Sequence, residues 1–303
     1  MDLAAELIAR HVVLVLGVLT LLTLAATALF WRLTVRFGPL LWSWVAALWE
    51  VLRSSRVAER LRRVPVIGPS LTSTLTAARY LGVVGVIGFV LAAAAWVGFF
   101  ELADEIGVGE SLAEFDEALS AALSEHVSRD TLAAFAVITH LGDFGFLLAF
   151  SAFVLGVLMI QRRWLLAAAW AAATASGGLL NQALKAVFER SRPVHEYGLA
   201  NEVGWSFPSG HASGAMLVYG LLAYLLVRHT PPRSHIPIAL LAAALILFVG
   251  SSRVILQVHY LSDVLAGYAS AAAWAALWIV ALEAFVWRDV PAARGEPGRT
   301  TVF

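Results

Sequence analysis

Residues 236–287 read IPIALLAAALILFVGSSRVILQVHYLSDVLAGYASAAAWAALWIVALEAFVW. The runs 236–255 and 262–287 each supply about twenty mostly apolar residues, the length that an α-helix needs to cross a bilayer. A polar break separates them, and ionisable side chains are rare within membrane segments unless they have a function. This stretch therefore predicts two spanning helices with a functional segment between them.

The same length criterion selects five further apolar runs. They are residues 11–31, 80–100, 132–160, 164–188 and 211–228. The chain is 60% hydrophobic and only 14% charged, whereas soluble domains carry about 25% charged residues. We therefore predict an all-α polytopic membrane protein, with a six-helix transmembrane core after an N-terminal transmembrane helix and an interfacial helix.

Three domains follow from these runs. Residues 1–79 are expected to form a membrane-anchoring extension, whose first run is kept as a transmembrane helix rather than cleaved as a signal peptide. Within this extension the Trp-rich stretch 38–52 suits an interfacial helix, although a cytoplasmic connector explains it at least equally well. Residues 80–287 are expected to form the six-helix core, and residues 288–303 a disordered cytoplasmic tail.

Charge and cysteine content exclude several classes of protein. The formal net charge is zero, which gives no reason to expect a nucleic-acid partner. The chain has no cysteine, and this excludes disulfides, thiolate metal sites and a cysteine nucleophile.

The charges of the loops predict the orientation in the membrane, because Arg-rich connections stay in the cytoplasm. Basic residues follow the third, fifth and last of the seven runs: Arg162, Arg163, Arg228, Arg233, Arg288, Arg294 and Arg299. The segment 101–128, by contrast, contains acidic residues and no Lys or Arg. We therefore place 101–130, 189–210 and 253–262 on the periplasmic or extracellular side of the cell (inner) membrane.

The first polar cluster on that side holds two cations. Lys185 and Arg192 are seven residues apart, so on a helix they would share one face. Pro193 disfavours helix at Arg192 and frees its side chain to turn toward a ligand. Two cations at this spacing suit the oxygens of a phosphate. Lys185 is also the only lysine of the chain, which chance explains as readily as a need for an ammonium group.

The second cluster opens the run 211–228. Ser209 suits an N-cap, Gly210 lets the backbone approach an anion, and the free N–H groups of a helix start can bind phosphate. His211 lies in the first turn of that helix. An ordinary N-cap with a solvated histidine explains the same residues at least equally well.

The third cluster pairs a histidine with a carboxylate. His259 and Asp263 are four residues apart, so on a helix Asp263 can accept a hydrogen bond from one ring nitrogen. The other nitrogen is then left as a nucleophile or base. Arg253 adds a third cation. Such a pair is often structural, but its place on the same membrane face as the other clusters favours a function.

Together the clusters read Lys-x6-Arg-Pro, Pro-Ser-Gly-His and Ser-Arg-x5-His-x3-Asp. This order resembles the three-part signature of the type 2 phosphatidic acid phosphatase family, whose superfamily includes vanadium haloperoxidases and glucose 6-phosphatase. The matching residues are Lys185, Arg192, Pro193, Ser209, His211, Arg253, His259 and Asp263. The resemblance covers about residues 80–287 and leaves 1–79 outside it.

The resemblance implies a membrane phosphatase that works through a phosphohistidine intermediate, and the residue types suit this chemistry. His259 would attack phosphorus, Asp263 would orient its ring, and His211 would exchange a proton with the leaving group and water. The phosphoryl oxygens would be held by Lys185, Arg192, Ser209, Gly210 and Arg253.

We expect no metal and no cofactor, because three cations would repel a divalent ion and only one carboxylate joins them. Two further polar residues, His140 and Asp143, lie near the outer end of the run 132–160. A satisfied helix-end pair is favoured for them over a role in lining or tuning the site.

The expected substrate is a lipid phosphate or pyrophosphate of the undecaprenyl pyrophosphate, phosphatidylglycerol phosphate, phosphatidic acid or lipid A phosphate type. The alternative is a protein that binds or transports lipids with phosphate headgroups without turnover. His259, His211 and Asp263 argue against it, since pure binding needs only the cations. A haloperoxidase with bound vanadate is a third reading, disfavoured by the membrane core. The oligomeric state stays open.

Overall fold

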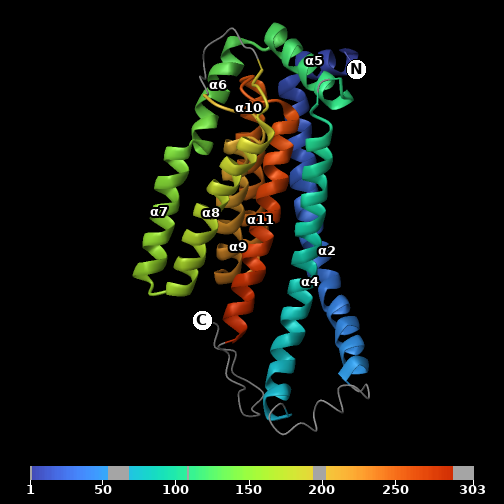
Figure 1. Cartoon of the computed structure of the whole chain (residues 1–303), viewed down its shortest axis with the longest axis vertical. Coiled ribbons are helices and arrows are strands. Elements are labelled where there is room, and N and C mark those ends of the chain that lie inside the picture. The colour runs from blue at the N-terminus through green and yellow to red at the C-terminus, as the bar shows by residue number, and fades with distance from the viewer. Residues whose placement is uncertain (1, 54–67, 108, 194–202, 289–303) are drawn as a thin grey trace. The chain divides into compact units, whose positions relative to one another are not determined.

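The computed structural model describes residues 2–53, 68–107, 109–193 and 203–288, and within these ranges the chain is helical with no strand (Figure 1). The α-helices are α1 (Asp2–Arg10), α2 (Val12–Arg53), α4 (Gly68–Asp104), α5 (Ser111–His126), α6 (Arg129–Thr139), α7 (Phe144–Ile160), α8 (Trp164–Phe188), α9 (Gly210–His229), α10 (His235–Ile255) and α11 (Leu261–Arg288). Two short 3-10 helices, η1 (His140–Gly142) and η2 (Pro232–Ser234), precede α7 and α10. The all-α polytopic class is thus confirmed.

Five helices of the described ranges are long and apolar enough to cross a membrane, and α6 with α7 makes a sixth span if this bent pair is counted once. The five candidate spans are Val12–Phe37, Gly85–Asp104, Gly210–His229, Pro232–Ile255 and Leu261–Val286. The predicted run 164–188 forms α8, whose 25 residues give about 38 Å of helix at 1.5 Å per residue. Ser, Thr, Asn and Gln among its alanines make α8 less apolar than the other spans.

The stretch 38–52 does not form a helix of its own. It continues α2, which runs unbroken through Gly38 and Pro39 to Arg53, while the apolar span within α2 ends at Phe37. A proline inside a helix removes one backbone hydrogen bond and crowds the preceding turn, so the sequence favoured a break that α2 does not show. The predicted tail lies outside the described residues from position 289 onward.

The chain divides into two compact units. One unit joins residues 1–31 to 91–276, and the other joins 32–90 to 277–303. All described residues of the predicted site belong to the first unit. The domain boundaries expected at 79/80 and 287/288 stay predictions.

The predicted run 132–160 is broken where α6 gives way to α7. The two helices meet at an angle of 42° across η1. Gly142 ends η1 at a close approach, since a Cβ there would lie 2.5 Å from Val249 Cγ1 and 3.0 Å from His211 Cδ2. The break therefore brings the α6–α7 connection directly onto α9 and α10.

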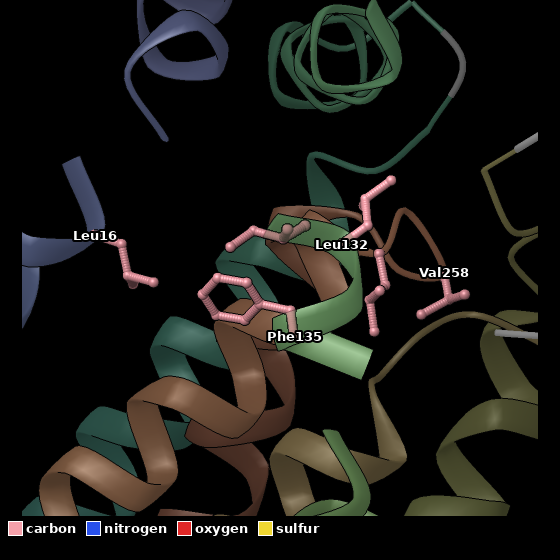
Figure 2. Close-up of a cluster of buried hydrophobic side chains, with 6 residues drawn as sticks. Leu16, Leu132, Phe135 and Val258 are labelled. Atoms are coloured by element: carbon pink, nitrogen blue, oxygen red, sulfur yellow. The ribbon is translucent and has the colours of Figure 1, made fainter. Parts of the chain in front are cut away.

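A buried apolar cluster ties α2, α6 and the end of α10 together (Figure 2). Its members are Leu16, Leu132, Phe135, Ile255, Leu256 and Val258. Val258 is the chain neighbour of His259, so this cluster fixes the backbone that carries the predicted nucleophile.

A second apolar cluster joins α1 to α5. Its buried members are Ala5, Ala9, Leu119 and Leu123. Burying these side chains removes apolar surface from water, and this holds α5 against the same unit as the predicted site.

The start of α9 is packed tightly against α11 at Gly267. A Cβ at this position would lie 2.8 Å from the backbone oxygen of Ser209 and 3.1 Å from Ala212 Cβ. We expect Gly267→Ala to push α11 away from the start of α9, at a cost of about 1–3 kcal/mol for overpacking. Intrinsic tryptophan fluorescence during heating should show a lower melting temperature, with hydrolytic activity reduced at 25 °C.

The matched control is Gly220→Ala in α9, where a Cβ would meet nothing within 4 Å. This variant should melt at the wild-type temperature or slightly above, because alanine favours helix over glycine. Equal melting temperatures for both variants would contradict the close packing at Gly267.

Candidate active site

Three segments of the chain meet at the predicted site. The first follows α8, the second leads from residue 203 into the start of α9, and the third joins α10 to α11. Backbone bonds connect them: the Ser206 N–H donates to the Arg190 carbonyl at 2.8 Å, and the Ser209 N–H donates to the Asp263 carbonyl at 2.9 Å. These bonds hold the three predicted clusters together independently of their side chains.

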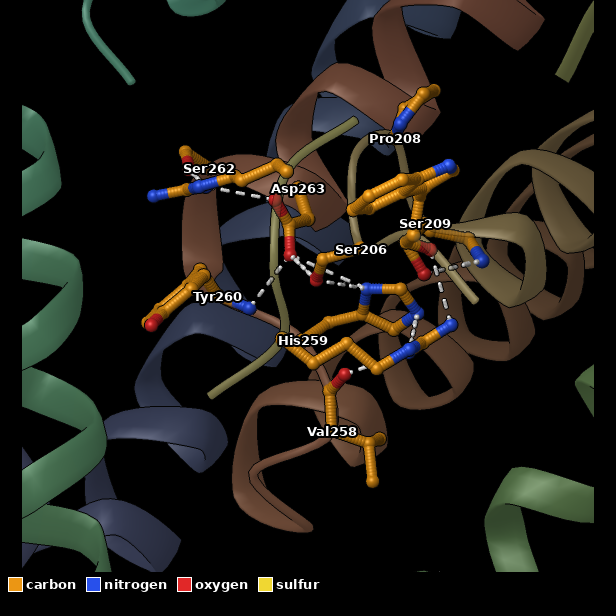
Figure 3. Close-up of polar contacts among 12 residues, drawn as sticks. Ser206, Pro208, Ser209, Val258, His259, Tyr260, Ser262 and Asp263 are labelled. Atoms are coloured by element: carbon orange, nitrogen blue, oxygen red, sulfur yellow. Dashed lines mark hydrogen bonds and ion pairs between the residues drawn. The ribbon is translucent and has the colours of Figure 1, made fainter. Parts of the chain in front are cut away.

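The ring of His259 is held on both nitrogens (Figure 3). Its Nε2 lies 3.0 Å from Arg192 Nη1, and its Nδ1 lies 3.3 Å from Asp263 Oδ2 and 3.2 Å from Ser206 Oγ. A guanidinium can only donate, so Nε2 must be the acceptor and Nδ1 must carry the proton. The unprotonated nitrogen is therefore Nε2, whose electron pair accepts from Arg192, and a phosphate that takes over this guanidinium would leave Nε2 able to act as a nucleophile.

Burial keeps this ring neutral. His259 is 2% exposed, and its burial lowers the imidazole pKa to about 4. The hydrogen bond and charge of Asp263 raise the pKa, while the charges of Arg192 and Arg253 lower it further. The result is a neutral imidazole at neutral pH, because burial and the two cations outweigh the carboxylate.

Asp263 uses both of its carboxylate oxygens. Oδ2 accepts hydrogen bonds from Ser206 Oγ and from the Tyr260 N–H at 2.9 Å, besides its contact with His259. Oδ1 accepts from Arg190 Nη1 at 2.8 Å. The carboxylate is fully buried, so these partners fix its orientation and through it the orientation of the His259 ring.

Arg190 links Asp263 to a second buried carboxylate, Asp116 of α5. The guanidinium donates from Nη1 to Ser262 Oγ at 2.7 Å and from Nη2 to Asp116 Oδ2 at 3.0 Å. It also lies over the Tyr260 ring, 4.3 Å from the ring centre. Asp116 is 1% exposed, and burial raises its pKa even though Ser262 and Arg190 oppose this. The acidic segment 101–128 thus delivers a carboxylate into the site.

Neither Arg190 nor Asp116 was among the predicted site residues. One signal for Asp116 is present in the sequence, since it lies on the same helical face as Leu112, Leu119 and Leu123. A carboxylate on the apolar face of a helix needs a buried partner. No comparable sequence signal singles out Arg190.

The predicted phosphate-binding cations are held by loop carbonyls. Lys185 donates to the Trp205 carbonyl at 2.5 Å and to the Ser206 carbonyl at 3.2 Å. Arg192 donates to the carbonyls of Gly204 at 2.9 Å, Trp205 at 3.2 Å and Val258 at 2.8 Å. The two cations therefore converge on one loop.

Their convergence does not come from a shared helix face, which was the expected reason. Helix α8 ends at Phe188, and Glu189 turns the chain with a left-handed φ of 44°. Arg192 lies beyond this turn in non-helical backbone, consistent with the effect expected of Pro193. The left-handed turn, and not helical periodicity, directs Arg192 to the site.

Arg253 is also close to His259. It is 1% exposed, and its Nη1 donates to Thr139 Oγ1 at 2.6 Å. This bond anchors the guanidinium to the end of α6.

The second predicted cluster has the expected helix start. Ser209 is the N-cap of α9, and its Oγ accepts from the Ala212 N–H at 3.5 Å. At Gly210 a Cβ would approach Asn181 Oδ1 to 3.3 Å, so this position is tight. His211 follows in the first turn, and its Nε2 lies 2.8 Å from Asp143 Oδ1. Asp143 therefore does not only form a pair at the end of its own helix, because it also contacts His211 of α9.

Within the described part of the chain, no group of three or more His, Asp or Glu side chains is arranged to hold a metal ion. The anion-attracting residues dominate the site: Lys185, Arg192 and Arg253. This donor set suits a phosphate group.

The contact of Arg190 with two buried carboxylates yields a prediction. Arg190→Gln would leave Asp116 and Asp263 buried without their cation, which costs about 3–5 kcal/mol when one partner of a buried pair is removed. We expect a lower melting temperature and a large loss of kcat. The double variant with Asp116→Asn should regain part of the stability, since it removes one of the orphaned charges. Wild-type stability of Arg190→Gln would contradict the buried pairs.

Parts of the chain are similar to known proteins. Residues 164–287 match the model of the PAP2 superfamily. Phosphatidylglycerophosphatase B of Bacillus subtilis (strain 168) is 36% identical over 133 residues, which are 43% of this chain and 65% of that protein. Lipid A 1-phosphatase of Rhizobium johnstonii is 33% identical over 119 residues, covering 36% of this chain and 43% of that protein. The alignments thus span less than two thirds of either relative.

A solved structure agrees over a larger share. The crystal structure of the first transmembrane PAP2 type phosphatidylglycerolphosphate phosphatase from Bacillus subtilis superposes with a TM-score of 0.56 at 30% identity. The match covers 62% of this chain and 94% of that one. Its sequence identity, its coverage and the shared helical fold agree with the family model: the chain is an integral membrane protein that belongs to the PAP2 superfamily.

Proposed function

We propose that this protein is a metal-independent phosphatase that hydrolyses a lipid phosphate or pyrophosphate through a phosphohistidine intermediate. The observation that carries the proposal is the neutral imidazole of His259, whose Nε2 lies 3.0 Å from Arg192 Nη1. A phosphate drawn to that guanidinium would meet the electron pair of Nε2.

The first half-reaction transfers the phosphoryl group to the enzyme. Nε2 of His259 forms a bond to phosphorus while the bond from phosphorus to the leaving oxygen breaks. His211 gives a proton to that oxygen, so the lipid leaves as an alcohol or as a phosphate. Asp263 stabilises the positive charge that develops on the His259 ring.

The second half-reaction restores the enzyme. A water oxygen attacks phosphorus, the bond to Nε2 breaks, and His211 accepts the proton that the water loses. Inorganic phosphate leaves with the remaining hydroxyl group. The cations Lys185, Arg192 and Arg253, with the N–H groups at the start of α9, would stabilise the charge on the phosphoryl oxygens in both steps.

A lipid substrate is favoured by the apolar rim of the loop that holds the cations. Val203 is 95% exposed and Trp205 is 43% exposed, while the carbonyls of Gly204 and Trp205 bind Lys185 and Arg192. An apolar chain attached to the bound phosphate would find apolar surface there. The names of the two curated relatives, which refer to phosphatidylglycerophosphate and lipid A, also favour a lipid.

The proposed location is the cell (inner) membrane, with the site on the periplasmic or extracellular side. Figure 1 supports this, because the turn between α7 and α8 lies at the opposite end of these helices from α5 and α6. That turn carries Arg162 and Arg163, whereas α5 is acidic and contributes Asp116 to the site. Basic turns stay in the cytoplasm.

The decisive test is phosphate release by detergent-purified protein from a panel of lipid mono- and diphosphates, with EDTA present. We expect release to persist in EDTA and to vanish in His259→Ala. Quenching in alkaline detergent with a ³²P-labelled substrate should trap a base-stable, acid-labile label on the wild-type chain and none on His259→Ala. The control His229→Asn, at the other end of α9, should behave as wild type.

Two results would contradict the proposal. Release that stops in EDTA and returns with a divalent ion would show a metal-dependent reaction. Binding of lipid phosphates without any release would support the alternative of a binding or transport protein without turnover.

The apolar rim leads to a separate prediction about substrate class. Trp205→Ser should raise KM for a long-chain lipid phosphate about tenfold or more, since burying an aromatic side chain is worth about 1.5–3 kcal/mol. KM for a short-chain, soluble analogue should stay near the wild-type value. An equal change of KM for both substrates would show that Trp205 supports the cations and does not contact the lipid chain.

A further inference from the structure

Asp143 binds two histidines from different parts of the fold. Its Oδ1 lies 2.8 Å from Nε2 of His211 in the first turn of α9, and its Oδ2 lies 2.6 Å from Nδ1 of His140 in η1. The His211 side chain is 14% exposed, whereas that of His140 is 71% exposed. The carboxylate thus lies between a mostly buried imidazole, that of His211, and an exposed one, that of His140.

Asp143 does not cap its own helix with its side chain while it makes these contacts. It is the N-cap residue of α7, yet its side chain makes no capping hydrogen bond. An aspartate at an N-cap normally accepts from the N–H groups of the first turn. Here the carboxylate turns away from its own helix and toward α9, so satisfaction of the α7 end does not explain its orientation.

The surrounding backbone is shaped for this contact. Gly142, the residue before Asp143, lies so close to His211 that a Cβ would be 3.0 Å from its Cδ2 and 3.2 Å from its Cβ. The Tyr219 hydroxyl donates to the Leu141 carbonyl at 2.6 Å, which fixes η1 against α9. These two packing contacts hold the carboxylate of Asp143 beside the His211 ring.

We propose that Asp143 is the positioning residue of His211: it accepts a hydrogen bond from Nε2–H, fixes the ring and stabilises its protonated form. This inference rests on the proposed function, in which His211 is the general acid. A bond from Nε2 to Asp143 leaves Nδ1 as the nitrogen that exchanges its proton with the reacting groups.

The proton balance follows directly. In the first half-reaction the Nδ1 proton of the imidazolium moves to the leaving oxygen as its bond to phosphorus breaks, and His211 becomes neutral. In the second half-reaction the proton lost by the attacking water returns to Nδ1. The Nε2 proton stays on the bond to Asp143 throughout.

The charges around this pair determine the expected pH behaviour. On α10, Arg253 bonds to Thr139 beside η1, and its positive charge disfavours an imidazolium nearby. His140 competes for the same carboxylate from η1, and Tyr219 faces η1 from α9. Among these groups Asp143 is the one whose charge favours protonated His211. Its removal should therefore shift the basic limb of the pH profile of kcat/KM to lower pH.

The experiment compares two leaving groups in the full-length protein. Asp143→Asn keeps the shape of the side chain and removes its charge. Its kcat/KM for an alkyl or lipid phosphate should fall about 100-fold, within the range that general acid catalysis contributes. Its kcat/KM for p-nitrophenyl phosphate should fall about threefold or less, because that leaving group needs little protonation. The basic limb should move to lower pH with the alkyl substrate.

Two variants separate positioning from a structural role. Asp130→Asn, an exposed aspartate at the start of α6, is the matched control and should keep the wild-type rates and pH profile. His140→Gln removes the other partner of Asp143 and should leave the basic limb in place or move it to higher pH. Equal losses of kcat/KM by Asp143→Asn on both substrates would overturn the inference. The same pH profile of kcat/KM for Asp143→Asn and His140→Gln would also overturn it.

A measurement without turnover distinguishes this inference from the proposed function. NMR of ¹⁵N-histidine-labelled protein, with His211→Gln to assign the signal, follows protonation of the His211 ring against pH. In Asp143→Asn the ring should lose its proton at lower pH than in the wild type. An unchanged titration overturns the inference even when the wild type hydrolyses lipid phosphates. A shifted titration in a protein that does not hydrolyse lipid phosphates would support the pairing of Asp143 with His211 and contradict the proposed phosphatase activity.

Discussion

The carboxylate of Asp263 is fully buried, and a buried charge is tolerated only when its oxygens are paired. Arg190 supplies that pairing at 2.8 Å and is itself neutralised by Asp116 at 3.0 Å. Charges of alternating sign therefore run from Asp263 through Arg190 to Asp116 of α5, and the neutral His259 ring contacts the first of them. Each charged group is tolerated in the interior because its neighbour has the opposite sign, so α5 contributes a carboxylate to the predicted site.

This constraint explains how elements far apart in the chain are organised. Asp116 can reach Arg190 only if α5 lies directly over the site, and the apolar contacts of Leu119 and Leu123 with α1 hold it there. Similarly, Val258 anchors the backbone of the proposed nucleophile, His259, in the cluster shared by α2, α6 and α10. The packing of the N-terminal helices is thus linked to the position of one imidazole.

Local spacing was enough to predict the helical class, because apolar run length depends on short stretches of chain. His259 and Asp263 do pair as predicted, at 3.3 Å between Nδ1 and Oδ2, but not on a shared helix, because His259 lies in the connection before α11. The partners Arg190 and Asp116 were not predictable in this way. They are 74 residues apart, and only the tertiary fold decides which buried carboxylate meets which cation. The bend before Asp143 was not predicted either: polar residues and glycines mark the place in the sequence, but the 42° angle and the close approach of Gly142 to α9 and α10 are properties of the tertiary fold.

The two histidine–aspartate pairs differ in what balances the carboxylate. Asp263 faces His259 but is also bound by the cation of Arg190, so less of its charge favours an imidazolium, and burial keeps the ring neutral. Asp143 faces His211 at 2.8 Å, and its second oxygen binds an exposed histidine in place of a buried arginine. Its charge therefore remains available to a protonated His211. In the proposed mechanism two similar pairs thus take opposite tasks, one imidazole as nucleophile and the other as acid, according to the third group that each carboxylate binds.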